Sequence, residues 1–404
     1  MLASHLYSRS SVQNGASSLP PIRFGPSLLP RRPLVTFTFL HGIFRNKGGG
    51  IGFEPPISLL RPSDSPTRVA QPFFQIGDQG ASDLGSGLGY CTNLSNLTLK
   101  LSGNEIGSEG ASGLCYGLGK CTNLSNLVLY LEENQIGDEG ISDLGSGLGK
   151  CTNLSYLTLY LRFNQICAVG TSGLGSGLGK CSNLQSLKLD LQDNQINGEG
   201  ASGLGFGLGK CTNLSNLTLY FDKYQIDVIG QLGLGFGLGK CTNLTNLTFN
   251  FKQLYIDSQA ASCLGSDLAK STNLTNLALN LEKKEIGDTS IQILGFVLSN
   301  LTNLSNLTLN LSKNQIRDEG VYILGSDLRK CTNLSNLTLN LGFNYLNYQG
   351  ALDLCYNLGQ LTKLSNLTLD LFKNKITRSN NLKLKCLKSK RLVILKMYID
   401  DKSW

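Results

Sequence analysis

The sequence predicts an α/β solenoid in which parallel strands line a concave face and helices line a convex face. Three observations predict it: a repeat of 30 residues, leucines that alternate in the first half of each repeat, and apolar residues at helical spacing in the second half. A fixed period of roughly 20–50 residues is typical of a solenoid or a propeller. One strand and one helix per repeat make the strands parallel, with the helices as crossover connections. The expected shape is therefore a curved stack, or horseshoe.

The repeat is defined by a leucine that recurs every 30 residues without a slip. These leucines are Leu94, Leu124, Leu154, Leu184, Leu214, Leu244, Leu274, Leu304, Leu334 and Leu364. Ten units extend from about residue 91 to residue 390, and a half unit, Phe74–Tyr90, precedes them. Residues 392–399 repeat the leucine spacing once more, starting 28 residues after Leu364, and predict a terminal strand. The repeat domain is therefore expected to occupy residues 71–404.

Each unit contains two different apolar periods. Leucines alternate from Leu127 to Leu131, which predicts a strand with one buried face. In residues 140–148 the apolar residues follow a helical spacing, which predicts an amphipathic helix. Asp138 is expected to be the N-cap of this helix, and Glu139 is favourable in its first turn.

The segment from Leu124 to Ile136 follows the pattern L-x-x-L-x-L-x-L-x-x-N-x-I, which resembles the leucine-rich repeat. The helix-bearing unit resembles the ribonuclease-inhibitor class, and it is similar to repeat proteins of ciliates, some of which are joined to protein kinase domains. The resemblance covers about residues 74–400 and implies the horseshoe fold. One departure is that the usual L-x-L-x-x-N is lengthened here to L-x-L-x-L-x-x-N. The two extra residues predict a longer strand or a bulge.

Residues 1–70 differ from the repeats in composition and are expected to be a disordered basic tail rich in Pro, Ser and Gly. They contribute +6 of the net charge of +8, so the repeats themselves are nearly balanced. A nucleic-acid partner is not expected, because the repeats lack a basic surface. An organelle transit peptide and a misjudged gene start are alternative interpretations of this tail.

Glycine-rich strings at the end of each predicted helix superficially resemble a phosphate-binding loop. Residues 145–152 fail the motif because its first glycine would fall on Leu144 and Cys151 follows the lysine. A phosphate loop also precedes a helix, whereas this string ends one. We instead expect the glycines to let helices of adjacent units approach closely.

Most of the 12 cysteines share one position of the repeat. This position holds Ser271, Leu301 or Leu361 in other units, so it is expected to be a small buried site and not a metal ligand. The cysteines at this position are Cys91, Cys121, Cys151, Cys181, Cys211, Cys241 and Cys331. We expect reduced thiols, no metal and no cofactor.

Several features favour the cytoplasm. The chain has no apolar stretch long enough to span a membrane, and its start lacks the apolar core of a secretory signal. Asn-x-Ser/Thr sequons such as those at Asn93, Asn123 and Asn153 recur in successive units, where glycans would collide.

An asparagine ladder is expected at the turn after each strand, where its side chains can satisfy backbone groups. The ladder positions are Asn104, Asn134, Asn164, Asn194, Asn314, Asn344 and Asn374. Tyr224, Leu254 and Lys284 interrupt the ladder, which indicates either a functional kink or drift in tolerant units.

The concave face is the candidate binding surface, because its residues vary between units. Tyrosines flanked by charges resemble a hot spot that anchors a protein partner, although tyrosine also simply suits strands. The candidate residues are Tyr130, Tyr160, Asp190 and Tyr220 on the strands, with Glu132, Arg162, Phe163, Asp193 and Asp222 just beyond them.

The sequence therefore predicts a monomeric, non-enzymatic scaffold that binds a protein through its concave sheet. Two alternatives stay open: the repeat portion of a kinase-linked family without its kinase domain, and a regulator of small GTPases. The kinase motifs G-x-G-x-x-G, V-A-I-K, H-R-D and D-F-G are absent from the sequence.

Overall fold

A computed structural model describes residues 34–38, 45–46, 51–52, 75–221, 228–251, 267–268, 270–282, 286–376, 382 and 391–399. The described strands are β1 (Leu34–Thr38), β2 (Arg45–Asn46), β3 (Ile51–Gly52), β4 (Asn96–Lys100), β5 (Asn126–Tyr130), β6 (Tyr156–Tyr160), β7 (Ser186–Asp190), β8 (Asn216–Phe221), β9 (Asn246–Phe251), β10 (Asn276–Asn280), β11 (Asn306–Asn310), β12 (Asn336–Asn340), β13 (Asn366–Asp370) and β14 (Ile394–Tyr398). The described helices are α2 (Gly77–Leu88), α3 (Ser108–Leu118), α4 (Asp138–Leu148), α5 (Ala168–Leu178), α6 (Gly198–Leu208), α7 (Val228–Leu238), α9 (Asp288–Ser299), α10 (Asp318–Leu328) and α11 (Tyr348–Leu358).

The strands form one 12-stranded sheet in the order β1-β4-β5-β6-β7-β8-β9-β10-β11-β12-β13-β14. From β4 to β13 each strand pairs in parallel with the strand one repeat away, as Leu127 pairs with Leu157. The last step is shorter, because Leu367 pairs with Leu395. These registers confirm the 30-residue unit, the parallel sheet and the trimmed terminal strand.

The sheet also includes a strand from the segment where the sequence predicts a disordered tail. Strand β1 pairs in parallel with β4, with Leu34 opposite Asn96. Two short strands, β2 and β3, pair with each other in antiparallel orientation. The division of the chain at residue 70 stays a prediction.

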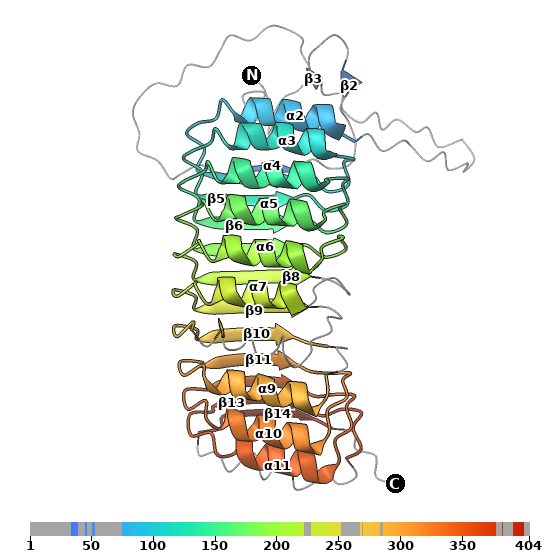
Figure 1. Cartoon of the computed structure of the whole chain (residues 1–404), viewed down its shortest axis with the longest axis vertical. Helices are drawn as coiled ribbons and strands as arrows, with labels where there is room; N and C mark the ends of the chain where they lie inside the picture. Colours follow the sequence, from blue (N-terminus) through green and yellow to red (C-terminus); the bar gives the residue numbers. More distant parts are fainter. Residues whose placement is uncertain are drawn as a thin grey trace, which may run out of the picture.

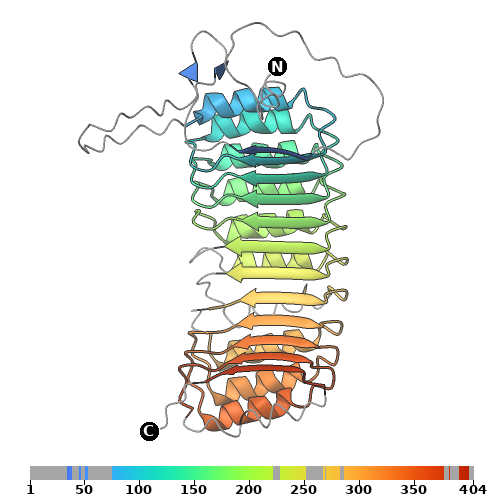
Figure 2. The same cartoon turned by 180° about the vertical axis from the view of Figure 1, so that it is seen from behind.

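Strands and helices occupy opposite sides of the stack. Figure 1 shows the helices in front, and Figure 2 shows the sheet from the other side. In both views the stack of helices extends beyond the stack of strands at its two ends, so the strands lie on the concave side. This arrangement agrees with the fold class predicted from the sequence.

The lengthened motif gives a longer run of pairing without a bulge. Strands β5 and β6 pair one to one. Backbone hydrogen bonds continue past the strand end, from the Leu131 N–H to Tyr160 (2.9 Å) and from the Glu133 N–H to Arg162 (2.9 Å). The two extra residues therefore do not form a bulge between β5 and β6; each strand has five residues, and backbone hydrogen bonding continues into the turn.

Glycines bring neighbouring helices into backbone contact, as the sequence predicts. A Cβ atom on Gly147 of α4 would lie 2.6 Å from the backbone oxygen of Cys115 in α3. A Cβ atom on Gly117 of α3 would overlap the backbone of Gly85 in α2. A side chain at either position would therefore push adjacent units apart.

The recurrent cysteine ties each unit to the helix before it. The thiol of Cys151 donates to the backbone oxygen of Leu118, the last residue of α3, at 3.3 Å. Ser271 replaces the thiol with a hydroxyl that donates to Leu238 at 3.2 Å. The position is therefore a buried donor to a helix C-terminal carbonyl, which explains the exchange of cysteine with serine but not with leucine. All cysteines in the described residues are free thiols.

The asparagine ladder has the role that the sequence predicts. Asn164 accepts from the Ile136 N–H at 3.0 Å and donates to the carbonyls of Leu131 (2.9 Å) and Leu161 (3.0 Å). Each ladder side chain therefore satisfies buried backbone groups of its own unit and of the preceding one. The interruptions at Tyr224, Leu254 and Lys284 lie outside the described residues.

The expectation that Asp138 is the N-cap of its own helix is wrong. The N-cap of α4 is Gly137, and α4 begins at Asp138. The Asp138 carboxylate instead accepts from the backbone N–H of Cys167, the N-cap of α5, at 2.7 Å. Because the helices of successive units are so close, the aspartate reaches the N-terminus of the next helix.

Candidate functional site

Three side chains of each strand face the concave surface, because the two leucines between them are buried. In β11 these are Asn306, Thr308 and Asn310, which alternate with Leu307 and Leu309. Stacking the units in register turns the three positions into three columns along the sheet. We call them the first, central and third columns, in the order of the chain.

From β9 to β13 the concave columns are nearly uniform in composition and bonded to themselves. In the first column Asn246, Asn276, Asn306, Asn336 and Asn366 each donate from Nδ2 to Oδ1 of the asparagine one unit earlier. In the third column Asn310 donates to Asn280 at 3.0 Å and Asn280 donates to Asn250 at 3.2 Å. These amides use their hydrogen-bonding capacity within the protein.

From β4 to β8 the same columns contain aromatic and charged side chains that contact each other. The rings of Tyr130 and Tyr160 stack with centroids 4.7 Å apart. The Lys188 ammonium lies 4.9 Å from the Tyr160 ring centroid and 5.5 Å from that of Tyr220. Lys100 approaches the Tyr130 ring at 5.8 Å. We call these five residues the tyrosine–lysine cluster.

Lys188 joins the two parts of the cluster. Its ammonium donates to the Tyr160 hydroxyl at 2.9 Å. This hydrogen bond, with smaller contributions from the surrounding Tyr160, Tyr220 and Asp190, raises the pKa of Lys188 despite its partial burial. Lys188 therefore keeps its positive charge at neutral pH, between the faces of two aromatic rings.

The sequence correctly assigns the inner and outer sides of these strands but overestimates the exposure of the tyrosines. Leu129 is buried and the neighbouring Tyr130 is on the concave side. Tyr130, Tyr160 and Tyr220 are half-buried and not fully exposed. Stacking between adjacent strands and the approach of Lys188 account for the covered part of their surface.

The predicted residues beyond the strands form a separate rim at the turns. Arg162 forms an ion pair with Asp193 at 2.5 Å and lies 4.5 Å from the Phe163 ring centroid. Glu132 accepts from the Ser102 hydroxyl at 2.5 Å. Phe163 and Asp193 both have a left-handed backbone, with φ of 54°. That conformation is uncommon for residues other than glycine.

The structure describes Asp190, another of the predicted residues, but not Asp222. The Asp190 carboxylate accepts from the Gln192 N–H at 3.1 Å and so stabilises its own turn as well as facing Lys188. Asp222 lies outside the described residues. The structure therefore brings together Tyr130, Tyr160, Asp190 and Tyr220 in one surface, and Arg162, Phe163 and Asp193 in another.

The sequence interpretation missed Lys188 and Tyr156. Lys188 is the only charged residue in the central column of β4 to β13, where threonine dominates. Tyr156 replaces an asparagine of the first column and is 52% exposed. Tyr156 and Ser186 also separate the Asn96–Asn126 pair from the longer amide column that starts at Asn216. Comparison of each column with its own consensus would have found both residues.

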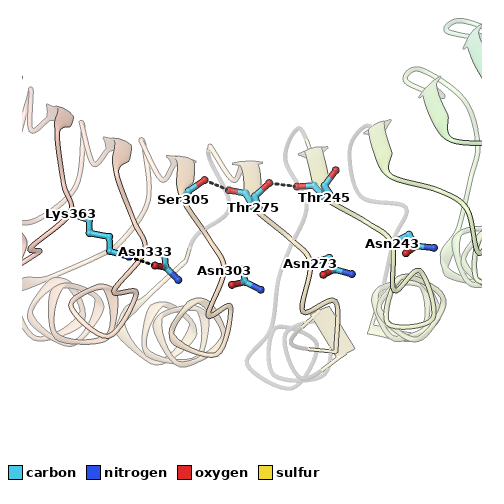
Figure 3. Close-up of a pocket in the computed structure, with 8 residues that line it drawn as sticks. All are labelled: Asn243, Thr245, Asn273, Thr275, Asn303, Ser305, Asn333 and Lys363. Atoms are coloured by element: carbon cyan, nitrogen blue, oxygen red, sulfur yellow. Dashed lines mark hydrogen bonds between the residues drawn. The ribbon is translucent and has the colours of Figure 1, made fainter.

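An open groove of about 640 Å³ lies at the edge where the strands begin, away from the tyrosine–lysine cluster (Figure 3). Its polar groups are already engaged with neighbouring units: Asn273 donates to the Thr242 carbonyl at 2.8 Å, and Lys363 donates to Asn333 at 2.6 Å. The groove is lined by Asn243, Thr245, Asn273, Thr275, Asn303, Ser305, Asn333 and Lys363. Because its donors bond within the protein, it is a weaker candidate than the cluster.

The described residues lack two other kinds of feature, a metal-binding cluster and a membrane-spanning helix. These residues contain no group of three or more His, Cys, Asp or Glu side chains placed to bind a metal ion. None of the described helices combines the length and apolar character needed to cross a membrane.

Comparisons with known proteins support the assignment of the repeats. Residues 93–115, 123–145, 181–205 and 303–324 match a family model described as Leucine Rich repeat. No curated protein matches the chain. Among solved structures, the chain is similar to an internalin (inlF) from Listeria monocytogenes str. 4b F2365, with 23% identity, a TM-score of 0.43, and coverage of 76% of this chain and 82% of that one. It is also similar to an internalin C2 (inlC2) from the same strain, with 18% identity, a TM-score of 0.28, and coverage of 78% and 92%.

The repeated motif, the matched segments and the parallel sheet, with a described helix between most successive strands, agree with one another. The chain is therefore a leucine-rich-repeat solenoid of alternating strands and helices.

Proposed function

We propose that this chain is a non-enzymatic scaffold that binds a protein partner through the concave surface of β4 to β8. Leucine-rich-repeat arrays typically bind proteins, and the site proposed here is the part of the concave face that departs from its own repeat. The observation that supports it most is the tyrosine–lysine cluster, in which tyrosine rings replace third-column amides and the Lys188 ammonium replaces a threonine of the central column.

The chemistry of the cluster indicates what it would recognise. Tyrosine rings offer large contact area with little conformational entropy to lose, and they are enriched among residues that dominate binding energy. Lys188 retains its charge and lies between Tyr160 and Tyr220. A partner segment with an apolar or aromatic side chain next to a carboxylate would therefore match this surface.

The scaffold would bind with little ordering cost. The cluster is on a continuous sheet, and the stacking of Tyr130 on Tyr160 already fixes those rings before binding. Preorganisation of this kind increases affinity, because fewer side chains must be immobilised in the complex. The rim of Arg162, Phe163 and Asp193 would surround the contact as its polar border.

The test uses substitutions that the protein itself accommodates at equivalent positions. Tyr130, Tyr160 and Tyr220 are replaced by asparagine, the residue at 250, 280, 310 and 340 in the same column. A partner is isolated by affinity purification with mass spectrometry, and its binding to both proteins is measured by calorimetry. Loss of a central tyrosine commonly costs about 2 kcal/mol, or roughly 30-fold in Kd, so the triple variant should bind at least that much more weakly.

Two controls separate binding from folding. The triple variant should unfold at nearly the same temperature as the unmodified chain, because the rings face away from the core. Leu129→Ala should instead destabilise the fold by about 2–5 kcal/mol, because it opens a buried cavity. Binding of the triple variant at unchanged affinity would place the partner elsewhere and reject the proposed site.

We also propose that the chain functions in the cytoplasm. Sequon asparagines at the strand entry use their side-chain nitrogen within the stack, as Asn153 donates to the Thr122 carbonyl at 3.1 Å. A glycan on that nitrogen would break the contact and collide with the next unit. Protein isolated from its native source should show no shift in mobility after enzymatic removal of N-linked glycans.

The finer family assignment is a proposal as well. Described helices of 11 or 12 residues support placement in the ribonuclease-inhibitor-like class.

Phosphate-release assays with candidate small GTPases would distinguish regulation of a GTPase from plain scaffolding. We expect that the chain does not stimulate GTP hydrolysis.

A further inference from the structure

The convex face has a repeating outward stripe on each helix. In α4 the stripe consists of Glu139, Asp143 and Ser146, and it continues to Lys150, two residues beyond the end of the helix; all four residues are exposed. Their spacing of four, three and four residues keeps them on one side of the helix. An acidic residue at the start and a lysine at the end also suit the helix dipole. A polar stripe of this kind is the ordinary solvent-facing surface of a repeat.

In α5, α6 and α7 apolar side chains replace part of this polar stripe. Val169 is 72% exposed, Ile229 57%, Phe206 53% and Phe236 41%. The Phe206 and Phe236 rings are 5.4 Å apart, so they form one continuous surface. We call these four residues the convex patch. Val169 and Ile229 lie at the other end of the helices, on either side of Glu199. Adjacent exposed aromatic side chains such as Phe206 and Phe236 are a feature of interaction surfaces.

We propose that the convex patch is the contact between two copies of this chain, with α6 packed antiparallel against α6 of the partner subunit. This dimer replaces the monomer expected from the sequence. The stripe of α6 has the order Glu199, Gly203, Phe206, Lys210. A twofold axis at its centre reverses that order in the second copy. Glu199 then faces Lys210 of the partner subunit, and Phe206 faces Gly203 of the partner subunit.

The same axis pairs α5 with α7 of the partner subunit. Phe236 of the partner subunit then lies opposite Gly173, so both aromatic side chains of the patch meet a glycine on the other copy. Val169 and Ile229 lie opposite Lys240 and Lys180 of the partner subunit, so the apolar contact is centred on the two phenylalanines. The two convex surfaces curve away from each other, so contact is limited to a few central helices. The convex patch has that extent, and the arrangement leaves the concave cluster of both copies open.

The charges at the two ends of the α6 stripe are available for this contact. Glu199 and Lys210 are exposed and form no ion pair with any of the described residues. Each copy would therefore supply one acidic and one basic end, and the dimer would gain two equivalent ion pairs at its border.

Sedimentation velocity of the full chain from about 1 to 100 µM, the range of weak to moderate affinity, tests the proposal. The unmodified chain should shift from the mass of one copy toward twice that mass as its concentration rises. Phe206→Ser with Phe236→Ser should raise the dimer Kd at least roughly 30-fold, as loss of central aromatic residues commonly does. Serine already occupies this exposed position in two other helices, as Ser146 in α4 and Ser176 in α5, so the fold should be unaffected.

Matched controls test whether a loss of dimer is specific to the convex patch and to its charged border. Tyr116→Ser changes the same stripe position in α3, outside the patch, and should leave the dimer intact. Glu199→Lys and Lys210→Glu should each weaken the dimer, whereas the double variant should regain it, because opposite charges face each other again. A chain that stays monomeric throughout, a dimer that survives the double serine substitution, or a double swap that is not rescued would overturn the proposal.

Discussion

At the scale of single residues, this protein is held together by side chains that satisfy the backbone of a neighbouring unit. Asn164 binds three buried backbone groups, Cys151 binds the terminal carbonyl of α3, and Asp138 binds the backbone N–H of Cys167, the N-cap of α5. Buried backbone groups without a partner cost free energy, so each contact resists separation of the units. Because these contacts recur among the described units, such residues join successive units along much of the stack.

Asn164→Ala should therefore be much more damaging than a change at an exposed asparagine. It leaves the Ile136 N–H and the carbonyls of Leu131 and Leu161 without the side chain that satisfies them. Each such group costs about 1–3 kcal/mol, so the free energy of unfolding should fall by about 3 kcal/mol or more. Asn153→Ala is the control, because it removes one exposed hydrogen bond. Equal urea midpoints for the two variants would contradict the role of the ladder.

The buried thiols predict how stability depends on pH. Burial raises the pKa of Cys151 and Cys211 to about 12 and that of Cys181 and Cys241 to about 11, from 9.0. Below pH 9 the thiols are protonated in both folded and unfolded chains, so their contribution to stability is complete. As pH rises further, the unfolded chain loses protons that the folded chain retains, and the free energy of unfolding falls.

The melting temperature should consequently drop steeply as the pH rises from 9 to 11. Replacing these four cysteines with serine should flatten the pH profile, because a hydroxyl at this position still donates, as Ser271 does. In the native protein at pH 8, iodoacetamide should modify the half-exposed Cys167 before the buried cysteines. A profile that does not change after the serine substitutions would mean that other groups cause the alkaline loss.

At the scale of secondary structure, the helices are specified by packing and not by intrinsic propensity. Glycine ordinarily weakens a helix interior by about 1 kcal/mol relative to alanine. Here, glycines such as Gly147 lie where adjacent helices make backbone contact. The close approach also brings Asp138 within reach of α5.

Gly147→Ala should therefore destabilise the protein, although the same change in an isolated helix is stabilising. Its Cβ would lie 2.6 Å from the Cys115 backbone oxygen, and overpacking of this kind costs about 1–3 kcal/mol. Ser146→Ala is the matched control, one residue away on the exposed stripe of the same helix. Chemical denaturation that shows Gly147→Ala to be as stable as the unmodified chain would exclude tight packing of α3 on α4.

The elements themselves could be predicted from periodicity, but their contacts across units could not. The alternating leucines and the 30-residue repeat determine where the strands and helices lie and how adjacent strands pair, because one face of each strand and each helix must be buried. The role of Asp138 depends on the distance to the next helix, which no single repeat specifies. The choice between a longer strand and a bulge likewise depends on the partner strand.

At the scale of the whole molecule, the concave face divides into two parts with different chemistry. From β9 to β13 its amides bond to each other, whereas from β4 to β8 tyrosines and lysines interrupt the pattern. The sequence predicted the tyrosines, since they alternate with core leucines. It missed Lys188, because that residue is informative only when compared with the threonines at the same position of the other strands.

The central claim is that the partner covers β4 to β8, and hydroxyl-radical footprinting of the complex tests it most directly. Oxidation of each aromatic side chain is measured by mass spectrometry with and without the purified partner. Tyr156 and the cluster tyrosines should become protected, whereas Phe343, which is exposed in the turn after β12, should not. Protection confined to Phe343 or to the convex aromatics, with unchanged oxidation of Tyr130, Tyr156, Tyr160 and Tyr220, would contradict the account.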